Sequence, residues 1–176
     1  IIKSDPILET KIPQIAFIGR SNSGKSSLIN SLISSKIARI SSFPGRTQEI
    51  NIFLINESFY LIDLPGYGFT KTSGLGQEKI AKLIDMYFFN SIYKQKKVIL
   101  IIDANIGFTV ADISMFNELK NHQKDIIIVA NKIDKLNQSE YHKRITEIKG
   151  ITGDYPVIPF SSTKYKGKGA LIDEIF

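Results

Sequence analysis

A short segment rich in glycine and serine, with one lysine near its end, carries the clearest chemical signature in the sequence. Residues 19–26 read GRSNSGKS and fit the pattern GxxxxGK[ST]. Glycines let such a backbone curl until successive N–H groups face one anion at the start of a helix. Lys25 would reach the β- and γ-phosphates of a nucleotide, and the Ser26 hydroxyl would bind magnesium. The segment predicted to hold phosphate comprises Gly19, Arg20, Ser21, Asn22, Ser23, Gly24, Lys25, Ser26 and Ser27.

A second motif, DLPG at residues 63–66, follows an apolar run farther along the chain. The Asp63 carboxylate can hold the hydration shell of magnesium, and Gly66 can offer its N–H to the γ-phosphate because no Cβ is in the way. A DxxG string alone is most often an ordinary turn, so the prediction depends on its place downstream of the phosphate loop. We predict that Asp63, Leu64, Pro65 and Gly66 line the triphosphate.

A polar loop at residues 42–48 contains the candidate for a further magnesium ligand, Thr47. P-loop GTPases need such a residue between the phosphate loop and the aspartate. Removal of the γ-phosphate would release both Thr47 and Gly66, which would turn hydrolysis into a change of shape. The predicted metal ligands are Ser26, Thr47 and Asp63, and the neighbours predicted to line the nucleotide are Gly45, Arg46, Gln48 and Glu49.

The base of the nucleotide is expected to be selected by residues 131–134, which read NKID and follow the apolar run 126–130. Asp134 would accept hydrogen bonds from the ring N–H and from the amino group that guanine has and adenine lacks. Each such charge-assisted bond is worth about 1.5–3 kcal/mol, which disfavours ATP. The stem of Lys132 would lie along the base, and Asn131 would tie this turn to the phosphate loop. The predicted base site comprises Asn131, Lys132, Ile133, Asp134, Phe160, Ser161 and Ser162.

The elements that must position these motifs alternate between strands and helices. Apolar runs predict strands at residues 14–18, 50–55, 59–62, 97–103, 125–130 and 157–160. Amphipathic spacing predicts helices at residues 25–32, 77–93, from Thr109 with a capping box to Asp112, 139–148, and at the C-terminus. Asn56-Glu57 reads as a hairpin turn, so one strand is antiparallel. We predict an α/β fold in three layers over residues 1–176, one domain, with a mostly parallel six-stranded sheet and helices on both faces.

Composition limits the class of protein and the kind of partner. The chain has 176 residues, 43% hydrophobic content and no cysteine, which excludes disulfides and thiolate metal sites and suits the cytoplasm. No apolar stretch approaches the roughly 20 residues of a membrane span, and the start has no secretory signal pattern. The net charge of +6 favours a polyanionic partner such as RNA, although a solvated basic surface is the alternative.

With its motifs in this order, the sequence resembles the TRAFAC GTPases and, within them, the EngB (YihA/YsxC) family. The resemblance covers nearly the whole chain and is carried by residues 19–30 (GRSNSGKSSLIN), 44–48 (PGRTQ) with Ile50-Asn51 behind them, and 63–68 (DLPGYG). It implies a Ras-like fold and binding of GTP or GDP with Mg²⁺. We further expect slow GTP hydrolysis, a cytoplasmic location and a monomer. The resemblance also implies a role in maturation of the large ribosomal subunit, through rRNA or a ribosomal protein, and a link to septation and cell division.

The resemblance also leads to expectations about the residues that would catalyse hydrolysis. Tyr67 stands where Ras-like proteins carry the glutamine that orients water, so intrinsic turnover should be slow. Asn22 resembles the ligand of a catalytic potassium ion in related GTPases; a loop residue bonding its own backbone is the alternative. The catalytic set is therefore Lys25, Thr47, Gly66 and Asn22. Basic residues expected near the nucleotide-sensitive loops are Arg20, Arg39, Arg46, Lys71, Lys164, Lys166 and Lys168.

Two departures from the family pattern and two competing functions remain. Asn131 stands where the family commonly has threonine, and Phe69-Thr70 replaces a commoner Tyr-Ala pair. The first is the usual residue of other GTPases, and the second affects the loop expected to face a partner. A P-loop kinase or ATPase is one competing function, which Asp134 argues against. A module that holds GTP without turnover for a septation partner is the other, which Tyr67 favours.

Overall fold

The architecture comes from a computed structural model, which describes residues 9, 11–33, 39–42, 50–68 and 74–176. The strands are β1 (Gln14–Gly19), β2 (Arg39–Ser42), β3 (Asn51–Ile55), β4 (Phe59–Asp63), β5 (Gln95–Asp103), β6 (Ile126–Asn131) and β7 (Val157–Pro159). The α-helices are α1 (Lys25–Leu32), α2 (Gly74–Phe88), α3 (Val110–Asn121), α4 (Gln138–Thr152) and α5 (Lys168–Ile175), and a 3₁₀ turn covers Ile133–Lys135.

All the strands belong to one sheet in the order β2-β3-β4-β1-β5-β6-β7. Strands β4, β1, β5, β6 and β7 are parallel, whereas β3 is antiparallel to both of its neighbours. The predicted fold class is confirmed, with one correction: the sheet has seven strands rather than six, because β2 adds a short edge. Its sequence, RISS, has a single apolar residue and therefore no periodicity that could have revealed it.

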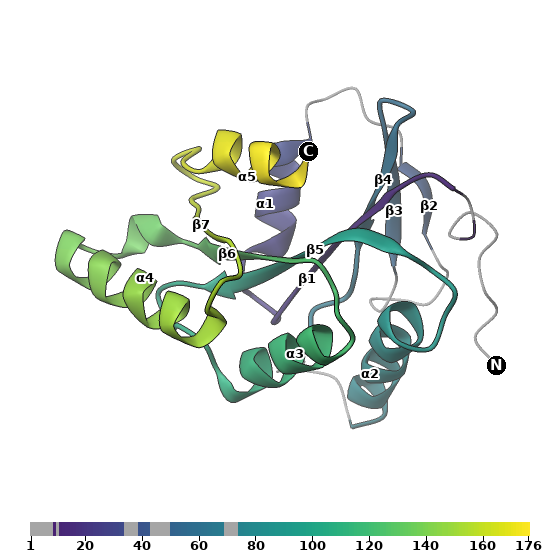
Figure 1. The fold of residues 1–176 in the computed structure, drawn as a ribbon, viewed down its shortest axis with the longest axis horizontal. Helices are drawn as coiled ribbons and strands as arrows, with labels where there is room; N and C mark the ends of the chain where they lie inside the picture. The colour runs from purple at the N-terminus through teal and green to yellow at the C-terminus, as the bar shows by residue number, and fades with distance from the viewer. Residues whose placement is uncertain (1–8, 10, 34–38, 43–49, 69–73) are drawn as a thin grey trace.

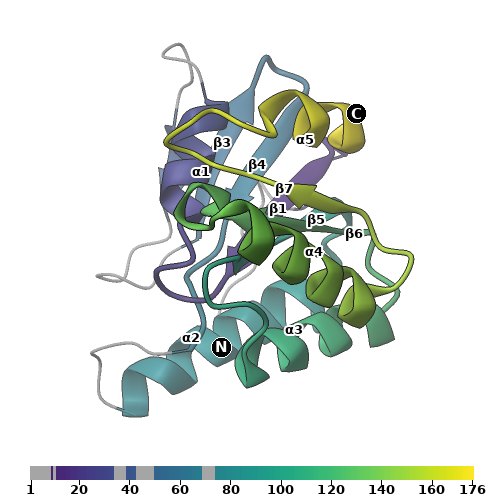
Figure 2. The same cartoon turned by 90° about the vertical axis from the view of Figure 1, so that its left-hand side faces the viewer.

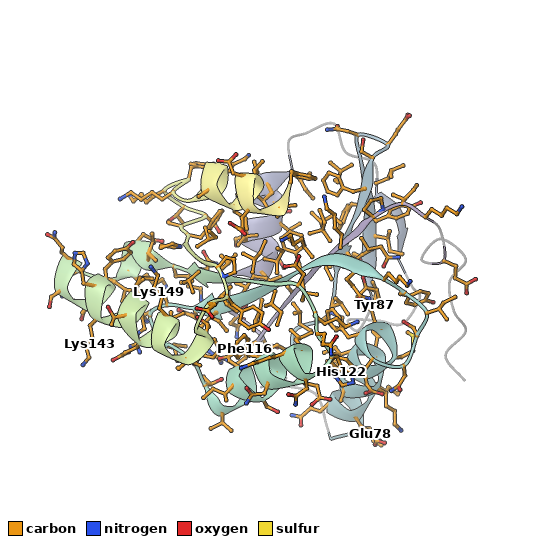
Figure 3. All side chains as sticks on the ribbon, viewed as in Figure 1. Glu78, Tyr87, Phe116, His122, Lys143 and Lys149 are labelled. Carbon is orange, nitrogen blue, oxygen red and sulfur yellow. The ribbon has the colours of Figure 1, made fainter. Side chains whose placement is uncertain are left out.

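Helices cover the two faces of the sheet and make three layers (Figures 1 and 2). Helices α1 and α5 lie on one face, and α2, α3 and α4 on the other. Alternate residues of β1 serve the two faces: Ile15 and Phe17 pack with the α1 and α5 side, and Ala16 and Ile18 with the opposite side. The aromatic side chains of Tyr87 on α2 and Phe116 on α3, labelled in Figure 3, are buried in the core between the sheet and helices α2, α3 and α4.

Local signals explain most element boundaries. The predicted capping box at the start of α3 is present: Thr109 N donates to Asp112 Oδ2 over 2.9 Å, and Asp112 N donates to Thr109 Oγ1 over 3.3 Å. The hairpin turn between β3 and β4 is also confirmed, with φ of 47° at Asn56 and 54° at Glu57. Helix α2 ends at Phe88 rather than at the predicted residue 93; Tyr93 continued the apolar spacing because it is itself buried.

The parallel strands bring their carboxyl ends to one edge of the sheet. The strands β1, β4, β5 and β6 end respectively at Gly19, Asp63, Asp103 and Asn131. Asp103 pairs in register with Asn131, and Asp63 with Phe17, two residues before the end of β1. The chain leaves β1 between β4 on one side and β5 on the other, which is the switch point where open α/β sheets bind ligands.

Candidate nucleotide-binding site

The predicted phosphate loop connects β1 to α1 and borders a pocket of about 570 Å³. Asn22 and Gly24 have left-handed φ values of 68° and 90°, so the backbone turns sharply before the helix begins. Gly24 caps α1, and a Cβ there would collide with the side-chain amide of Asn131. Only glycine fits both conditions. The pocket is lined by Arg20, Ser21, Asn22, Gly24, Lys25, Ser26, Ser27, Gly66 and Lys132.

Lys25 and Asp63 meet beside this pocket. The Lys25 ammonium forms an ion pair with Asp63 Oδ1, and both side chains are mostly buried, at 11% and 14% exposed. The other oxygen of Asp63 accepts a hydrogen bond from Asn51 Nδ2 over 3.2 Å. The structure thus joins the lysine of the first motif to the carboxylate of the second. A cationic group suited to phosphate and a carboxylate suited to a metal cation are therefore adjacent.

The residues near Asp63 suit magnesium delivered with a nucleotide. Among the described residues, no group of three His, Cys, Asp or Glu side chains could form a protein metal cage. Magnesium does not need one, because it usually keeps several waters and binds one or two carboxylates plus phosphate oxygens. The Asp63 carboxylate and the Ser26 hydroxyl are hard oxygen donors of this kind. The third predicted ligand, Thr47, lies outside the described residues, as do Gly45, Arg46, Gln48 and Glu49.

The DLPG segment contributes unequally to the pocket. Gly66 lines it, and a Cβ at Gly66 would lie 3.0 Å from the backbone nitrogen of Ser21. Leu64, predicted to line the nucleotide, is instead fully buried in the core, and its N–H donates to Phe17 O over 3.1 Å. Pro65 is not among the pocket-lining residues. Gly66 is therefore the member of this motif placed to present a backbone N–H to a phosphate.

Tyr67 bonds α3 and is not among the residues that line the phosphate pocket. Its side chain is 9% exposed, and its hydroxyl donates to Asp112 Oδ1 over 2.8 Å at the start of α3. Burial, followed by the neighbouring Asp112 charge, raises the pKa of Tyr67 well above its ordinary value, so the hydroxyl stays protonated. A phenol held in this way cannot orient a water molecule over the γ-phosphate as a glutamine does.

The turn at residues 131–134, predicted to read the base and called the base-reading turn below, carries an ionised carboxylate. Asp134 is exposed, and Ser161 Oγ donates to its Oδ1 over 2.5 Å. This hydrogen bond is the main reason that the pKa of Asp134 lies below its ordinary value. Ser161 is itself fully buried and also accepts the N–H of Lys164 over 3.1 Å, so its hydroxyl is fixed. The second carboxylate oxygen of Asp134 has no hydrogen bond from Ser161 and can accept donors from a purine.

Two side chains connect the base-reading turn to the phosphate loop. Asn131 Nδ2 donates to Ser23 O over 3.0 Å, which is the predicted tie between the two segments. Lys132 donates to the backbone oxygen of Asn22 and forms a 2.6 Å ion pair with Asp103 Oδ2. Sequence reasoning missed Asp103, which holds the Lys132 ammonium group. A signal was present, since Asp103 ends a buried strand just as Asp63 does.

The remaining predicted residues include buried side chains and buried polar atoms next to the pocket. Phe160 is fully buried, and its backbone carbonyl accepts the N–H of Ile133 over 3.2 Å. Within the described ranges, the buried side-chain atoms without a partner are Ser23 Oγ, Asn131 Oδ1, Ser162 Oγ and Thr152 Oγ1. All but the last belong to predicted nucleotide-binding residues. Buried polar atoms are rarely left unsatisfied, so their concentration here is what a polar ligand or bound water would explain.

A doubly wound sheet with a phosphate loop, a DxxG motif and an NKxD turn at its carboxyl edge defines a P-loop GTPase domain. Residues 14–132 match the family model described as "50S ribosome-binding GTPase". The chain belongs to the EngB family of GTP-binding proteins. It is 38% identical to the probable GTP-binding protein EngB of Clostridium perfringens over 99% of this chain and 90% of that protein. Identity to the EngB protein of Natranaerobius thermophilus is 45%, over 90% of this chain and 83% of that protein.

Solved structures give the same result. A crystal structure of a probable GTP-binding protein EngB matches with a TM-score of 0.76 at 25% identity, over 93% of this chain and 96% of that one. A structure of Era in complex with MgGDPNP and part of 16S ribosomal RNA matches with a TM-score of 0.69 at 25% identity. That match covers 94% of this chain and 56% of Era. Family membership therefore agrees with the GTPase class that the site defines.

Proposed function

We propose that the protein is a magnesium-dependent GTPase switch with slow intrinsic turnover that acts on the large ribosomal subunit during its assembly in the cytoplasm. One observation carries the nucleotide part of this proposal. The side chain of Asn131 joins the turn that holds the ionised Asp134 to the phosphate loop at Ser23. A purine bound at Asp134 and a triphosphate bound by Lys25 would then be held by one connected unit.

Each predicted catalytic residue has a defined task in this proposal. Lys25 would hold the β- and γ-phosphates, and the Gly66 N–H would bind the γ-phosphate oxygen. Ser26, Thr47 and Asp63 would hold Mg²⁺, which when bound neutralises charge developing on the transferred phosphate. Asn22 would serve as a ligand of K⁺. Slow turnover is supported by Tyr67, whose hydroxyl is engaged by Asp112 and so cannot position water.

A second candidate, a GTP-holding interaction module with negligible turnover, is favoured by the same burial of Tyr67. Its partner would belong to the septation machinery, in keeping with the link between this family and cell division. Phosphate release from GTP, measured with and without large ribosomal subunits, separates the two. Acceleration by the subunits supports the switch, whereas no release under either condition supports the module.

The ribosomal part of the proposal is supported by the family description and by basic surface near the base-reading turn. Lys164, Tyr165 and Lys166 are exposed at the tip of a loop that the antiparallel bridge between Ser161 and Lys166 closes. Lysines flanking an exposed aromatic ring suit RNA, which binds through phosphate contacts and stacking. Lys168 was predicted to join this surface, but its ammonium donates to Ser31 O over 2.6 Å.

The other predicted basic residues add less. Arg20 lies 3.9 Å from the Asp112 carboxylate and lines the phosphate pocket. Arg46 and Lys71 lie outside the described residues, as does the Phe69-Thr70 pair, and of Arg39 only the backbone is described. No helix in the described ranges is both long and apolar enough to cross a membrane.

Calorimetry with GDP, GTP and ATP in magnesium buffer tests the nucleotide part directly. We expect GDP and GTP to bind and ATP to bind far more weakly. A folded chain that ignores both guanine nucleotides would overturn the proposal.

A further inference from the structure

The backbone of Gly66 and Tyr67 is hydrogen-bonded to the phosphate loop. Tyr67 N donates to Gly19 O over 3.2 Å, and Ser21 N donates to Tyr67 O over 2.8 Å. Ser21 Oγ also approaches Gly66 O at 3.4 Å. The backbone that would present the Gly66 N–H to a γ-phosphate is therefore fixed to the loop that would hold the β-phosphate.

The side chain of Tyr67 fixes the same stretch of backbone through a hydrogen bond to the start of α3. Asp112 Oδ1 accepts the Tyr67 hydroxyl over 2.8 Å, and the Asp112 side chain is only 2% exposed. The second oxygen, Oδ2, serves the capping box, accepting Thr109 N over 2.9 Å and Thr109 Oγ1 over 2.6 Å. Arg20 of the phosphate loop approaches Oδ2 at 3.9 Å. A capping box needs one carboxylate oxygen, so the bond to Tyr67 is an additional task.

We propose that Asp112 is a positioning residue of the γ-phosphate site, because its bond to the Tyr67 hydroxyl holds the backbone at Gly66 in the orientation that presents its N–H to the γ-phosphate. The inference rests on the proposed function and adds to it a residue that touches neither nucleotide nor metal. Hydrogen bonds to a charged acceptor are stronger than neutral ones, and this acceptor is desolvated. Any movement of Gly66 would therefore have to break or re-form a bond at the start of α3.

The consequence differs between the two nucleotides. GDP has no γ-phosphate and does not need the Gly66 N–H, so loosening Tyr67 should leave GDP affinity nearly unchanged. A nucleoside triphosphate gains its γ-phosphate contact only if the peptide is held in place. Loss of the Tyr67–Asp112 bond should then lower triphosphate affinity selectively. A purely structural role for Asp112 would instead weaken both nucleotides together.

The test compares Tyr67→Phe and Asp112→Ala with Glu140→Ala as the matched control. Glu140 occupies the same position in the capping box of α4, where it bonds Asn137, and it is remote from the phosphate loop in sequence and element. Affinities for GDP and for the non-hydrolysable analogue GMPPNP are measured by calorimetry, and folding by thermal unfolding. Because Tyr67→Phe removes a single hydroxyl, it carries the test even if Asp112→Ala does not fold.

We expect both site variants to bind GMPPNP about 10- to 150-fold more weakly, as loss of one charge-assisted hydrogen bond implies, with GDP affinity within about twofold of wild type. Glu140→Ala should leave both affinities unchanged. The double variant should be no weaker than the weaker single variant, because both remove the same bond. Equal losses for GDP and GMPPNP, or no loss for GMPPNP, would overturn the proposal. If the wild-type protein bound neither nucleotide, the proposed function itself would fail, and the two failures would be distinguished.

Discussion

Replacement of Asp134 by asparagine should move nucleotide preference from guanine to xanthine. Ser161 Oγ donates to Asp134 Oδ1, and Ser161 is fully buried, so an asparagine side chain should keep its carbonyl oxygen on that hydroxyl. The amide NH₂ then takes the place of the second carboxylate oxygen. Guanine would face a donor where it needs an acceptor, whereas xanthine presents a carbonyl at that position and accepts the NH₂.

The expected size of the effect follows from the bonds exchanged. Losing one charge-assisted hydrogen bond costs about 1.5–3 kcal/mol, and two donors left facing each other add to that loss. We expect GDP affinity to fall by about 10²- to 10³-fold, and xanthosine diphosphate (XDP) to bind more tightly than GDP. Competition against a fluorescent guanine nucleotide measures both affinities on one scale.

Asp125→Asn provides the control for a change of charge. Asp125 lies just before the opposite end of β6 and pairs with Lys97 over 2.9 Å. The same substitution there should leave GDP affinity unchanged. If Asp134→Asn bound GDP as wild type does, or preferred GDP over XDP, the assignment of the base-reading carboxylate would be refuted.

Three further outcomes are expected. Because Ser161 lowers the pKa of Asp134, the carboxylate stays ionised until the pH falls through that depressed pKa. The GDP affinity measured by calorimetry should therefore be constant between about pH 7 and pH 5. A loss of affinity already at pH 5 would contradict this assignment. Replacement of Lys164 and Lys166 by alanine should reduce pelleting with large ribosomal subunits and weaken the salt dependence of that pelleting. Lys168→Ala should mainly lower the melting temperature, because Lys168 bonds Ser31 O. Equal pelleting by all variants would argue against this loop as an RNA contact. GTP turnover should be faster in potassium than in sodium buffer, and Asn22→Ala should abolish the difference; identical rates for wild type would remove the potassium site.

Much of the site could be predicted because its parts are local in sequence. The phosphate loop can be identified by its glycines and lysine at fixed spacing, and each strand before a motif is a run of apolar residues. The confirmed link from Asn131 to Ser23 spans 108 residues, yet the order of motifs along parallel strands was enough to predict it.

Other parts could not be predicted because they depend on which side chains the fold brings together. Asp112 was expected only to cap α3, and its second bond to Tyr67 connects segments 45 residues apart. Leu64 stands inside the DLPG motif yet packs in the same core as Tyr60 and Ile62, because it continues the alternation of β4 beyond Asp63. Ends of helices were also uncertain where a buried residue such as Tyr93 continued an apolar pattern beyond the last helical turn.

The fold explains why base and phosphate recognition can depend on each other although they come from separate segments. Gly24 leaves no room for a side chain beside the Asn131 amide, which bonds Ser23 O, and the Lys132 ammonium bonds both Asp103 and the carbonyl of Asn22. Both contacts arise because β1, β5 and β6 are adjacent and parallel, so their carboxyl ends meet. In the proposed function, a purine at Asp134 and phosphates at Lys25 would therefore be bound by segments that are already joined to each other. Such a connection would lower the entropy cost of binding a triphosphate, because the two halves of the site would not have to be ordered separately.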